Sequence, residues 1–242
     1  MFVPFFKKGD DNIANRKYNL NENYFEQINN EENAYWLGFI YADGFVSHKQ
    51  LIIELSSKDN EHLRKFINCL NANYPIKKIR KNNKEYSRIE IGSIKLVNDL
   101  NKLGCMTKKS LILKFPTLEQ VPKNLQIHFM RGYFDGDGTL SVSEGYRTRN
   151  DCNNKKYHYK AWCFKVLGTY EFLEEYSKNL NVVQNKILHN NNPNKNSFNL
   201  KFGGKNKINY ILEKLYNNST IYLDRKYEKY LEFKKDTNKQ PI

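Results

Sequence analysis

The 242-residue sequence has few cysteines and no long hydrophobic run. Its four cysteines, Cys69, Cys105, Cys152 and Cys163, form no CxxC pair, and their wide spacing argues against a zinc cluster or a disulfide framework. The longest stretch without a charged or strongly polar side chain, 34–42, is far shorter than the roughly 20 apolar residues of a bilayer span. The N-terminal apolar stretch ends too soon to form the core of a secretory signal. We therefore expect an intracellular protein with reduced thiols, not secreted, and cytoplasmic or organellar according to its host.

Acidic residues are outnumbered, with 26 Asp and Glu against 40 Lys and Arg, which gives a formal net charge of +14. This excess favours an acidic partner such as nucleic acid, because Lys and Arg displace the counterions condensed on phosphates. A second explanation remains open: Lys, Asn, Ile and Tyr are all abundant, which is the residue bias of an AT-rich genome. With 39% hydrophobic residues the chain can fill a sizeable core, and we expect it to fold.

An internal repeat organises the sequence. AYWLGFIYADGFVS at 34–47 aligns without gaps with HFMRGYFDGDGTLS at 128–141. The stretches that follow also align in the same order, 53–71 with 164–181 and 75–104 with 184–216. Two copies of one αββαββα unit fit this pattern. The stretch 145–159 has no counterpart in the first copy, and we interpret it as a loop that carries Arg147, Arg149, Lys155 and Lys156.

Residue periodicity predicts the elements of each half. After the second motif, Leu140 and Val142 alternate with polar residues, so one face of this strand is polar. Helices at 61–70 and 171–180 carry apolar residues three and four apart and can cover the inner sheet faces. The fold class is therefore α+β, with two pseudo-symmetric halves and antiparallel sheets whose uncovered polar face is either simply solvated or a nucleic-acid platform. The predicted bounds are an N-terminal arm at 1–28 that ends in a short helix at 22–28, a first half at 29–116, a linker at 117–124 and a second half at 125–242.

The two motifs place small residues four apart on predicted helices. Gly38 and Ala42 share a face in the first copy, as do Gly132 and Gly136 in the second. Small side chains on one face allow two helix backbones to approach closely. We expect the two motif helices to pack against each other.

Each motif helix ends at an Asp-Gly pair, Asp43-Gly44 or Asp137-Gly138. We expect each glycine to adopt the left-handed conformation of a helix C-terminus. If the helices pack together, the two carboxylates lie close, at the negative ends of both helix dipoles, and this arrangement costs free energy unless a cation is present. Oxygen ligands suit Mg²⁺, or another divalent cation such as Mn²⁺, and a metal beside a basic surface can support hydrolysis of a phosphodiester.

The Asp-Gly pairs allow two other interpretations. A calcium-binding EF-hand loop starting at Asp135 would need glycine at its sixth position and glutamate at its twelfth, where the sequence has Leu140 and Tyr146. This interpretation is disfavoured. The second is that Asp43 and Asp137 are ordinary polar residues in helix-ending turns, which is the usual meaning of a single Asp-Gly pair.

At these residues the sequence resembles the LAGLIDADG homing endonucleases, in the single-chain form that carries two motifs. WLGFIYADG at 36–44 and MRGYFDGDG at 130–138 match the nine-residue motif, and the resemblance extends over nearly all of 29–235. The sixth motif position is Asp135 in the second copy but Tyr41 in the first. This departure does not touch the eighth position, whose acids bind metal in the family.

The resemblance implies a fold and a function. The motif helices would form the interface between the halves, and saddle-like sheets would lie in the major groove of double-stranded DNA. The chain would act as a monomer, a site-specific endonuclease in intron homing that recognises a long asymmetric target. Asp43 and Asp137 would bind Mg²⁺ or a similar cation and cut both strands, leaving short 3′ overhangs. Relatives of this fold also act as intron maturases in RNA splicing or bind DNA without cutting it, so these functions stay open.

Further site residues follow from alignment and strand phase. The family has a basic residue near each scissile phosphate, and aligning GCMTKKS with IYLDRKY places Lys109 opposite Lys226, each a candidate for polarising the water network or stabilising phosphorane charge. Candidates for reading base edges are Ser47, Lys49, Arg88, Thr139, Ser141, Ser143, Lys165, Asn199 and Lys201. Candidates for phosphate contacts are Lys77, Lys78, Arg80, Lys81, Arg147 and Arg149.

Overall fold

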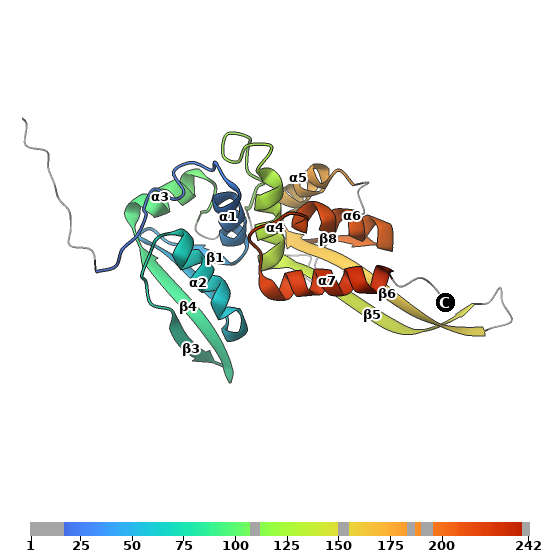
Figure 1. Ribbon diagram of the computed structural model, residues 1–242. Coiled ribbons are helices and arrows are strands. Elements are labelled where there is room, and N and C mark those ends of the chain that lie inside the picture. The colour runs from blue at the N-terminus through green and yellow to red at the C-terminus, as the bar shows by residue number, and fades with distance from the viewer. Residues whose placement is uncertain (1–16, 107–111, 150–154, 183–186, 190–195, 239–242) are drawn as a thin grey trace, which may run out of the picture.

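The computed structural model describes residues 17–106, 112–149, 155–182, 187–189 and 196–238 (Figure 1). The first half contains α1 (Glu31–Asp43), β1 (Gly44–Val46), β2 (Gln50–Ser56), the 3-10 turn η1 (Ser57–Asp59), α2 (Asn60–Cys69), β3 (Lys77–Lys81), β4 (Lys84–Gly92) and α3 (Ile94–Lys102). The second half contains α4 (Gln126–Asp137), β5 (Gly138–Arg149), β6 (Lys155–Gly168), α5 (Tyr170–Leu180), β7 (Ile187–His189), β8 (Phe198–Gly203), α6 (Lys205–Tyr216) and α7 (Asp224–Asn238). The repeated element order confirms the α+β class and the two similar halves; α7 is an addition to the second.

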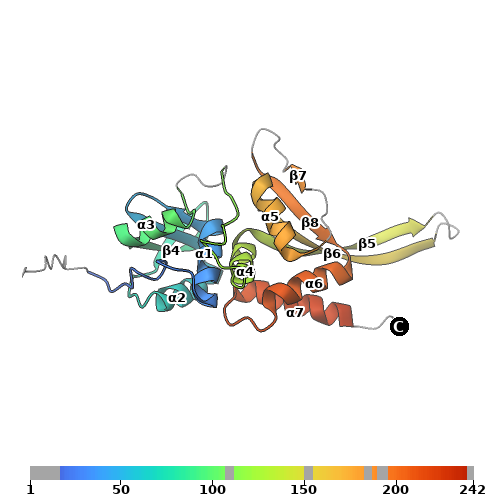
Figure 2. The ribbon, with the colours of Figure 1, turned by 90° about the horizontal axis from the view of Figure 1, so that it is seen from above.

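Both halves build the same antiparallel sheet. The strand order is β1-β2-β4-β3 in the first and β5-β6-β8-β7 in the second. Figure 1 and Figure 2 show α1 and α4 side by side in the middle of the molecule, with one sheet on either side. Since β1 continues α1 and β5 continues α4, the first strand of each sheet starts at this central helix pair. Residues 145–149 and 155–159 belong to the stretch predicted to be a loop, but they continue β5 and β6 as paired strands. Residues 150–154 of that stretch lie outside the described residues.

Alternate residues of each sheet form the core. In β4, Ile89 and Ile91 are fully buried, while Arg88 and Glu90, which alternate with them, are half-buried on the other face. In β6, Phe164 and Val166 are also fully buried, and the Phe164 ring stacks on Phe134 of α4. The alternation predicted after the second motif is also observed in β5, where Leu140 is buried and Val142 half-buried while Thr139, Ser141 and Ser143 are exposed. In the described part of the chain, α2 packs against β2 and β4, and α5 and α6 pack against β6 and β8, so these helices cover the apolar faces of the two sheets.

The central helices pack backbone against backbone. A Cβ atom added at Gly38 of α1 would lie 1.9 Å from the Phe129 carbonyl oxygen, and one added at Gly132 of α4 would lie 1.9 Å from the Tyr35 carbonyl oxygen. Glycine is therefore required at both positions by space. The start of α1 is fixed by a capping box in which the side chains of Asn30 and Asn33 satisfy each other's backbone N–H groups. The predicted close packing of the motif helices is confirmed.

The residues before α1 do not form the predicted short helix at 22–28. Residues 22–26 form turns, with Glu26 N–H donating to the Asn23 carbonyl at 2.9 Å. Asparagine side chains compete for backbone groups here, since Asn21 accepts from the Asn23 N–H, and this favours turns over helix. Phe25 is nonetheless fully buried, so the segment packs onto the first half.

Within the described ranges, none of the helices is long and apolar enough to cross a membrane.

Candidate active site

Two helix ends bring the predicted acids to the centre of the molecule. α1 ends at Asp43 and α4 ends at Asp137, and neither helix has a basic residue in its last turn. Asp43 is exposed and Asp137 is half-buried. Two carboxylates thus lie at the negative ends of two helix dipoles without a neighbouring cation from the same helix.

The glycines after these acids do not adopt the predicted left-handed conformation. Gly44 has φ −79° and Gly138 has φ −88°, and both are extended. Glycine is needed at these positions because a side chain would collide with neighbouring atoms. A Cβ at Gly44 would lie 2.8 Å from the Ile40 carbonyl oxygen, and one at Gly138 would lie 2.0 Å from the Phe134 ring. The chain therefore passes from helix to strand without a turn, and each acid lies directly at the start of a sheet.

The Asp43 carboxylate lies close to the end of α4. A Cβ on Gly136, the residue before Asp137, would lie 3.2 Å from Oδ2 of Asp43. Both negative charges also act on the hydroxyl of Tyr133, whose pKa is raised well above its ordinary value, first by burial and then by Asp137 and Asp43. The approach of α1 and α4 thus places the ends of both motif helices in one site.

Lys226, on the first turn of α7, points into the same site. Its side chain is 7% exposed, and its ammonium donates to the Gly138 carbonyl oxygen and lies 5.1 Å from the centre of the Phe134 ring. Burial lowers the pKa of Lys226 to about 8, and the negative charges of Asp135, Asp43 and Asp137 oppose that shift. Lys109, predicted as its counterpart, lies outside the described residues.

Asp135 holds the chain that leads to Lys226. It is fully buried and accepts hydrogen bonds from the hydroxyls of Tyr35 at 2.7 Å and Tyr216 at 2.5 Å and from the Leu223 N–H at 2.7 Å. Burial raises the pKa of Asp135, and the hydrogen bonds lower it. Leu223 directly precedes α7, so this carboxylate fixes where α7 begins.

Arg131, one helical turn earlier on α4, supports the same segment. Its guanidinium, 1% exposed, donates to the carbonyls of Ile221 at 2.9 Å and Leu215 at 3.0 Å and pairs with Glu31 of α1 at 2.6 Å. The sequence interpretation missed this role of Arg131 and Asp135. The available signal was two charged residues four apart inside an otherwise apolar motif helix, where the first copy has Leu37 and Tyr41.

Ion pairs join the start of α7 to the first half. Arg225 donates to both carboxylate oxygens of Asp59, at 3.0 and 2.9 Å, and Lys65 of α2 pairs with Asp224 at 2.6 Å. Lys226 directly follows Asp224 and Arg225 in the sequence, so its position depends on both halves.

The outer face of the first sheet carries paired charges. Arg88 lies between Glu54 and Glu90, with Arg88 Nε 2.8 Å from a Glu90 oxygen. Lys77 pairs with Glu90 at 2.6 Å and Lys81 with Glu54 at 2.7 Å. Three of the predicted DNA contacts are thus engaged within the protein.

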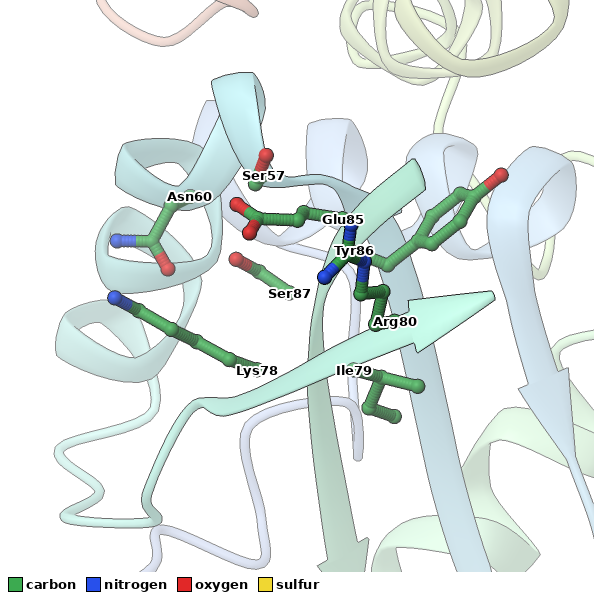
Figure 3. A pocket seen from close by; sticks show the side chains of 8 residues that line it. All are labelled: Ser57, Asn60, Lys78, Ile79, Arg80, Glu85, Tyr86 and Ser87. Atoms are coloured by element: carbon green, nitrogen blue, oxygen red, sulfur yellow. The ribbon is translucent and has the colours of Figure 1, made fainter. Parts of the chain in front are cut away.

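Lys78 and Arg80 lie on the opposite face of β3 from Lys77 and Lys81, because neighbours in a strand alternate. They line a cavity of about 320 Å³ beside the start of α2, together with Ser57, Asn60, Ile79, Glu85, Tyr86 and Ser87 (Figure 3). The four predicted phosphate contacts of β3 therefore belong to two different surfaces.

Three predicted base-reading residues are placed differently than expected. Ser47 and Lys49 lie in the turn after β1, which ends at Val46, and the Ser47 hydroxyl donates to the Gln50 carbonyl at 3.2 Å. A tight turn forms here because β1 pairs with β2 through only three residues. Asn199 is 6% exposed, whereas Lys201, two residues further along β8, is exposed.

The remaining candidates share one face of the second sheet. Strand register places Thr139 opposite Lys165, and Lys165 opposite Lys201. Ser141, Ser143 and Arg147 follow at alternate positions of β5, and the backbone of Arg149 continues the strand to its end. These side chains form a continuous polar and basic strip that starts at Asp137.

The donor set fits a hard divalent cation. Asp43 and Asp137 offer carboxylate oxygens only, and Mg²⁺ takes few protein ligands and keeps waters and phosphate oxygens as the rest. Within the described part of the chain, no group of three or more His, Cys, Asp and Glu residues could hold a metal ion by itself. A cation at this position would remove both the repulsion between the carboxylates and their unfavourable interaction with the helix dipoles.

Comparison with known proteins gives one sequence relative and a consistent fold. No family model matches the chain. The replication factor C small subunit of Methanocaldococcus jannaschii is 26% identical over 211 residues. That alignment covers 85% of this chain and 11% of the relative, so the chain spans about a tenth of the curated protein it matches.

Solved structures show that the chain has the fold of LAGLIDADG homing endonucleases. I-LtrWI bound to target DNA is 14% identical with a TM-score of 0.56, over 90% of this chain and 92% of that one. I-AabMI bound to uncleaved DNA is 12% identical with a TM-score of 0.58, over 87% and 91%. I-SmaMI bound to an uncleaved DNA target with calcium ions is 13% identical with a TM-score of 0.51, over 86% and 90%. The resemblance stated from the sequence is confirmed at the level of the fold.

Proposed function

We propose that this chain is a site-specific DNA endonuclease that acts as a monomer in intron homing. It hydrolyses one phosphodiester in each strand of a long asymmetric target and leaves short 3′ overhangs. One observation carries the proposal: the Asp43 carboxylate lies against the end of α4, the helix that ends at Asp137, between two sheets of a fold found in DNA-bound endonucleases.

Each residue of the site has a part in this chemistry. Asp43 and Asp137 would hold Mg²⁺ or Mn²⁺, which when bound supplies positive charge that activates water and stabilises the leaving oxygen. Lys226 places a buried ammonium beside the carboxylates, where it can stabilise the negative charge that develops on the phosphate in the transition state. Asp135 and Arg131 keep α7, and hence Lys226, in position.

The outer sheet faces would bind the DNA. Thr139, Ser141, Ser143 and Lys165 present hydroxyl and ammonium groups on one side of the second sheet, and such groups read base edges in a major groove. On the first sheet, Lys77, Lys81 and Arg88 would exchange their glutamate partners for phosphates. Each sheet begins directly after one of the two acids, since β1 follows Asp43 and β5 follows Asp137.

Cleavage of a plasmid library with random inserts tests this function. We expect the purified protein, with Mg²⁺ or Mn²⁺, to linearise a small subset of plasmids at one related site, and sequencing should find short 3′ overhangs. A chelator should stop the reaction. Specific binding without cutting under any divalent cation would contradict the endonuclease proposal. A splicing assay with the host intron transcript would then separate a maturase from a DNA-binding protein.

Replacing Lys226 by Met tests the role of the buried ammonium. We expect K226M to slow cleavage about 10- to 100-fold at pH 7 and to change the DNA dissociation constant less than about threefold. Since the pKa of Lys226 is about 8, wild-type protein holds this proton at pH 7 and loses it above pH 8. The rate advantage of wild type over K226M should therefore shrink as the pH rises through 8.

Lys229, one turn further along α7 and paired with Glu232, provides the matched control. K229M should cut at the wild-type rate at every pH. If K226M loses affinity and keeps its single-turnover rate, Lys226 is a phosphate anchor and has no part in the chemical step.

A further inference from the structure

The second half carries a two-stranded projection that the first half lacks. β1 and β2 have three and seven residues, whereas β5 and β6 have 12 and 14. All of β5 is paired with β6, from Gly138 opposite Val166 to Arg149 opposite Lys155. We call the outer part of this pair, Gly145–Arg149 and Lys155–Tyr159, the distal hairpin.

The helix layer ends before the distal hairpin begins. On the inner face, Phe233 of α7 packs against Trp162 with 5.4 Å between ring centres, and Asp236 pairs with Lys160. Beyond Lys160 the inner face is open, and Tyr146 is 74% exposed. Figure 1 and Figure 2 both show β5 and β6 running on past α7. The core therefore does not explain why these strands continue.

The distal hairpin continues the outer face of the second sheet. Residues opposite each other in an antiparallel pair point to the same side. Arg147 lies opposite Tyr157, and this pair is in phase with Thr139 opposite Lys165 near the carboxylates. Lys155 has the same phase. The strip proposed to bind DNA thus extends without a break to the end of the strands.

The outer face of the distal hairpin carries positive charge without a described acidic neighbour. Glu144 and its partner Lys160 have the opposite phase and belong to the inner face. Arg147 makes no ion pair with any described residue; its guanidinium lies 4.2 Å above the ring of Tyr159, which holds the planar group in place. This contrasts with Arg88 on the first sheet, which has two glutamate partners.

The length of the distal hairpin sets the length of DNA it can follow. Five residues per strand at about 3.3 Å each span about 17 Å. Base pairs rise about 3.4 Å along the helix axis, so this corresponds to about five base pairs.

We propose that the distal hairpin extends the DNA contact of the second half by about five base pairs, with Arg147 and Lys155 bound to phosphates, so that the two flanks of the target differ in length. The longer flank is the one bound by the second half. This proposal rests on the DNA-binding part of the proposed function and is independent of cleavage.

The salt dependence of binding tests the phosphate contacts. Each lost contact should reduce the slope of log K against log salt concentration by about 0.9. R147A and K155A should each show this decrease, and the double variant about 1.8. Lys156 is the matched control, because it is the exposed neighbour of Lys155 on the opposite face. K156A should keep the wild-type slope. The proposal would be overturned if K155A and K156A changed the slope equally, or if neither R147A nor K155A changed it.

Hydroxyl-radical footprinting on the target tests the length. Wild-type protein should protect about five more base pairs on one side of the cleavage positions than on the other, and R147A/K155A should lose protection at that end alone. Equal flanks in the wild type would contradict the proposal. The salt slopes can be measured on any duplex, so a chain that binds without cutting would overturn the proposed activity and leave this test intact. Normal cutting with unchanged slopes would overturn the distal contact only.

Discussion

D43N and D137N should each reduce double-strand cleavage about 100-fold or more, while specific DNA binding is retained or slightly strengthened. The amide keeps the shape of the carboxylate and removes its charge, so the site loses affinity for a divalent cation. The affinity for DNA should increase slightly, since one negative charge near the phosphates is removed. Single-turnover cleavage of a plasmid target and gel-shift binding with matched DNA measure the two effects.

The same variants carry a second readout in stability. Removing one of two neighbouring charges at helix C-termini should raise the free energy of unfolding by about 0.3 to 1 kcal/mol in the absence of metal. E175Q, at an acidic position on the exposed face of α5, serves as the control and should change neither cleavage nor stability. Wild-type cutting by D43N or D137N would remove that carboxylate from the mechanism. Lower cleavage accompanied by lower stability would indicate a structural role.

G132A should destabilise the protein by about 3 kcal/mol or more, and G38A by a similar amount. In both cases the new methyl group would lie 1.9 Å from a backbone oxygen of the partner helix, which cannot rotate away as a side chain could. The two helices would have to move apart, and the apolar contacts between them would be lost. Urea unfolding followed by circular dichroism measures the loss.

Gly92 offers the matched control for these substitutions. A Cβ at Gly92 would meet nothing within 4 Å, so G92A should leave stability within about 0.5 kcal/mol of wild type. If G132A and G38A also cost less than about 1 kcal/mol, the close approach of α1 and α4 is not essential for stability. A variant that stays folded should still cut more slowly, because the carboxylates of Asp43 and Asp137 would move apart.

The sequence predicted features that depend on local pattern. The internal repeat predicted two similar halves, and glycines four residues before or after another small residue predicted the helix packing at Gly38 and Gly132. Alternation predicted the inner positions of the strand after the second motif, Leu140 and Val142. These signals work because helix and strand periodicity fix which side chains share a face.

Other features depend on tertiary docking and leave no local pattern. The burial of Lys226 requires α7 to lie against α4, and its sequence surroundings are those of an exposed basic helix. The hydrogen bonds of Asp135 join residues up to 100 positions apart. Asp-Gly at a helix end suggested a left-handed glycine, but Gly44 and Gly138 are required by the space beside Ile40 and Phe134.

The backbone contact at Gly38 and Gly132 bears on protein engineering. A chimaera that joins one half of this chain to a foreign half keeps only one of the two glycines. The helix of the foreign half must then supply a small residue at the position of the other glycine. Each glycine contacts backbone atoms of the other helix and not a particular side chain. Any helix with a small residue at the equivalent position can therefore pack in the same way. For the proposed endonuclease, the spacing of the two helix ends would then be the same in every such hybrid, so target preference could be exchanged one flank at a time without altering the length of the proposed overhangs.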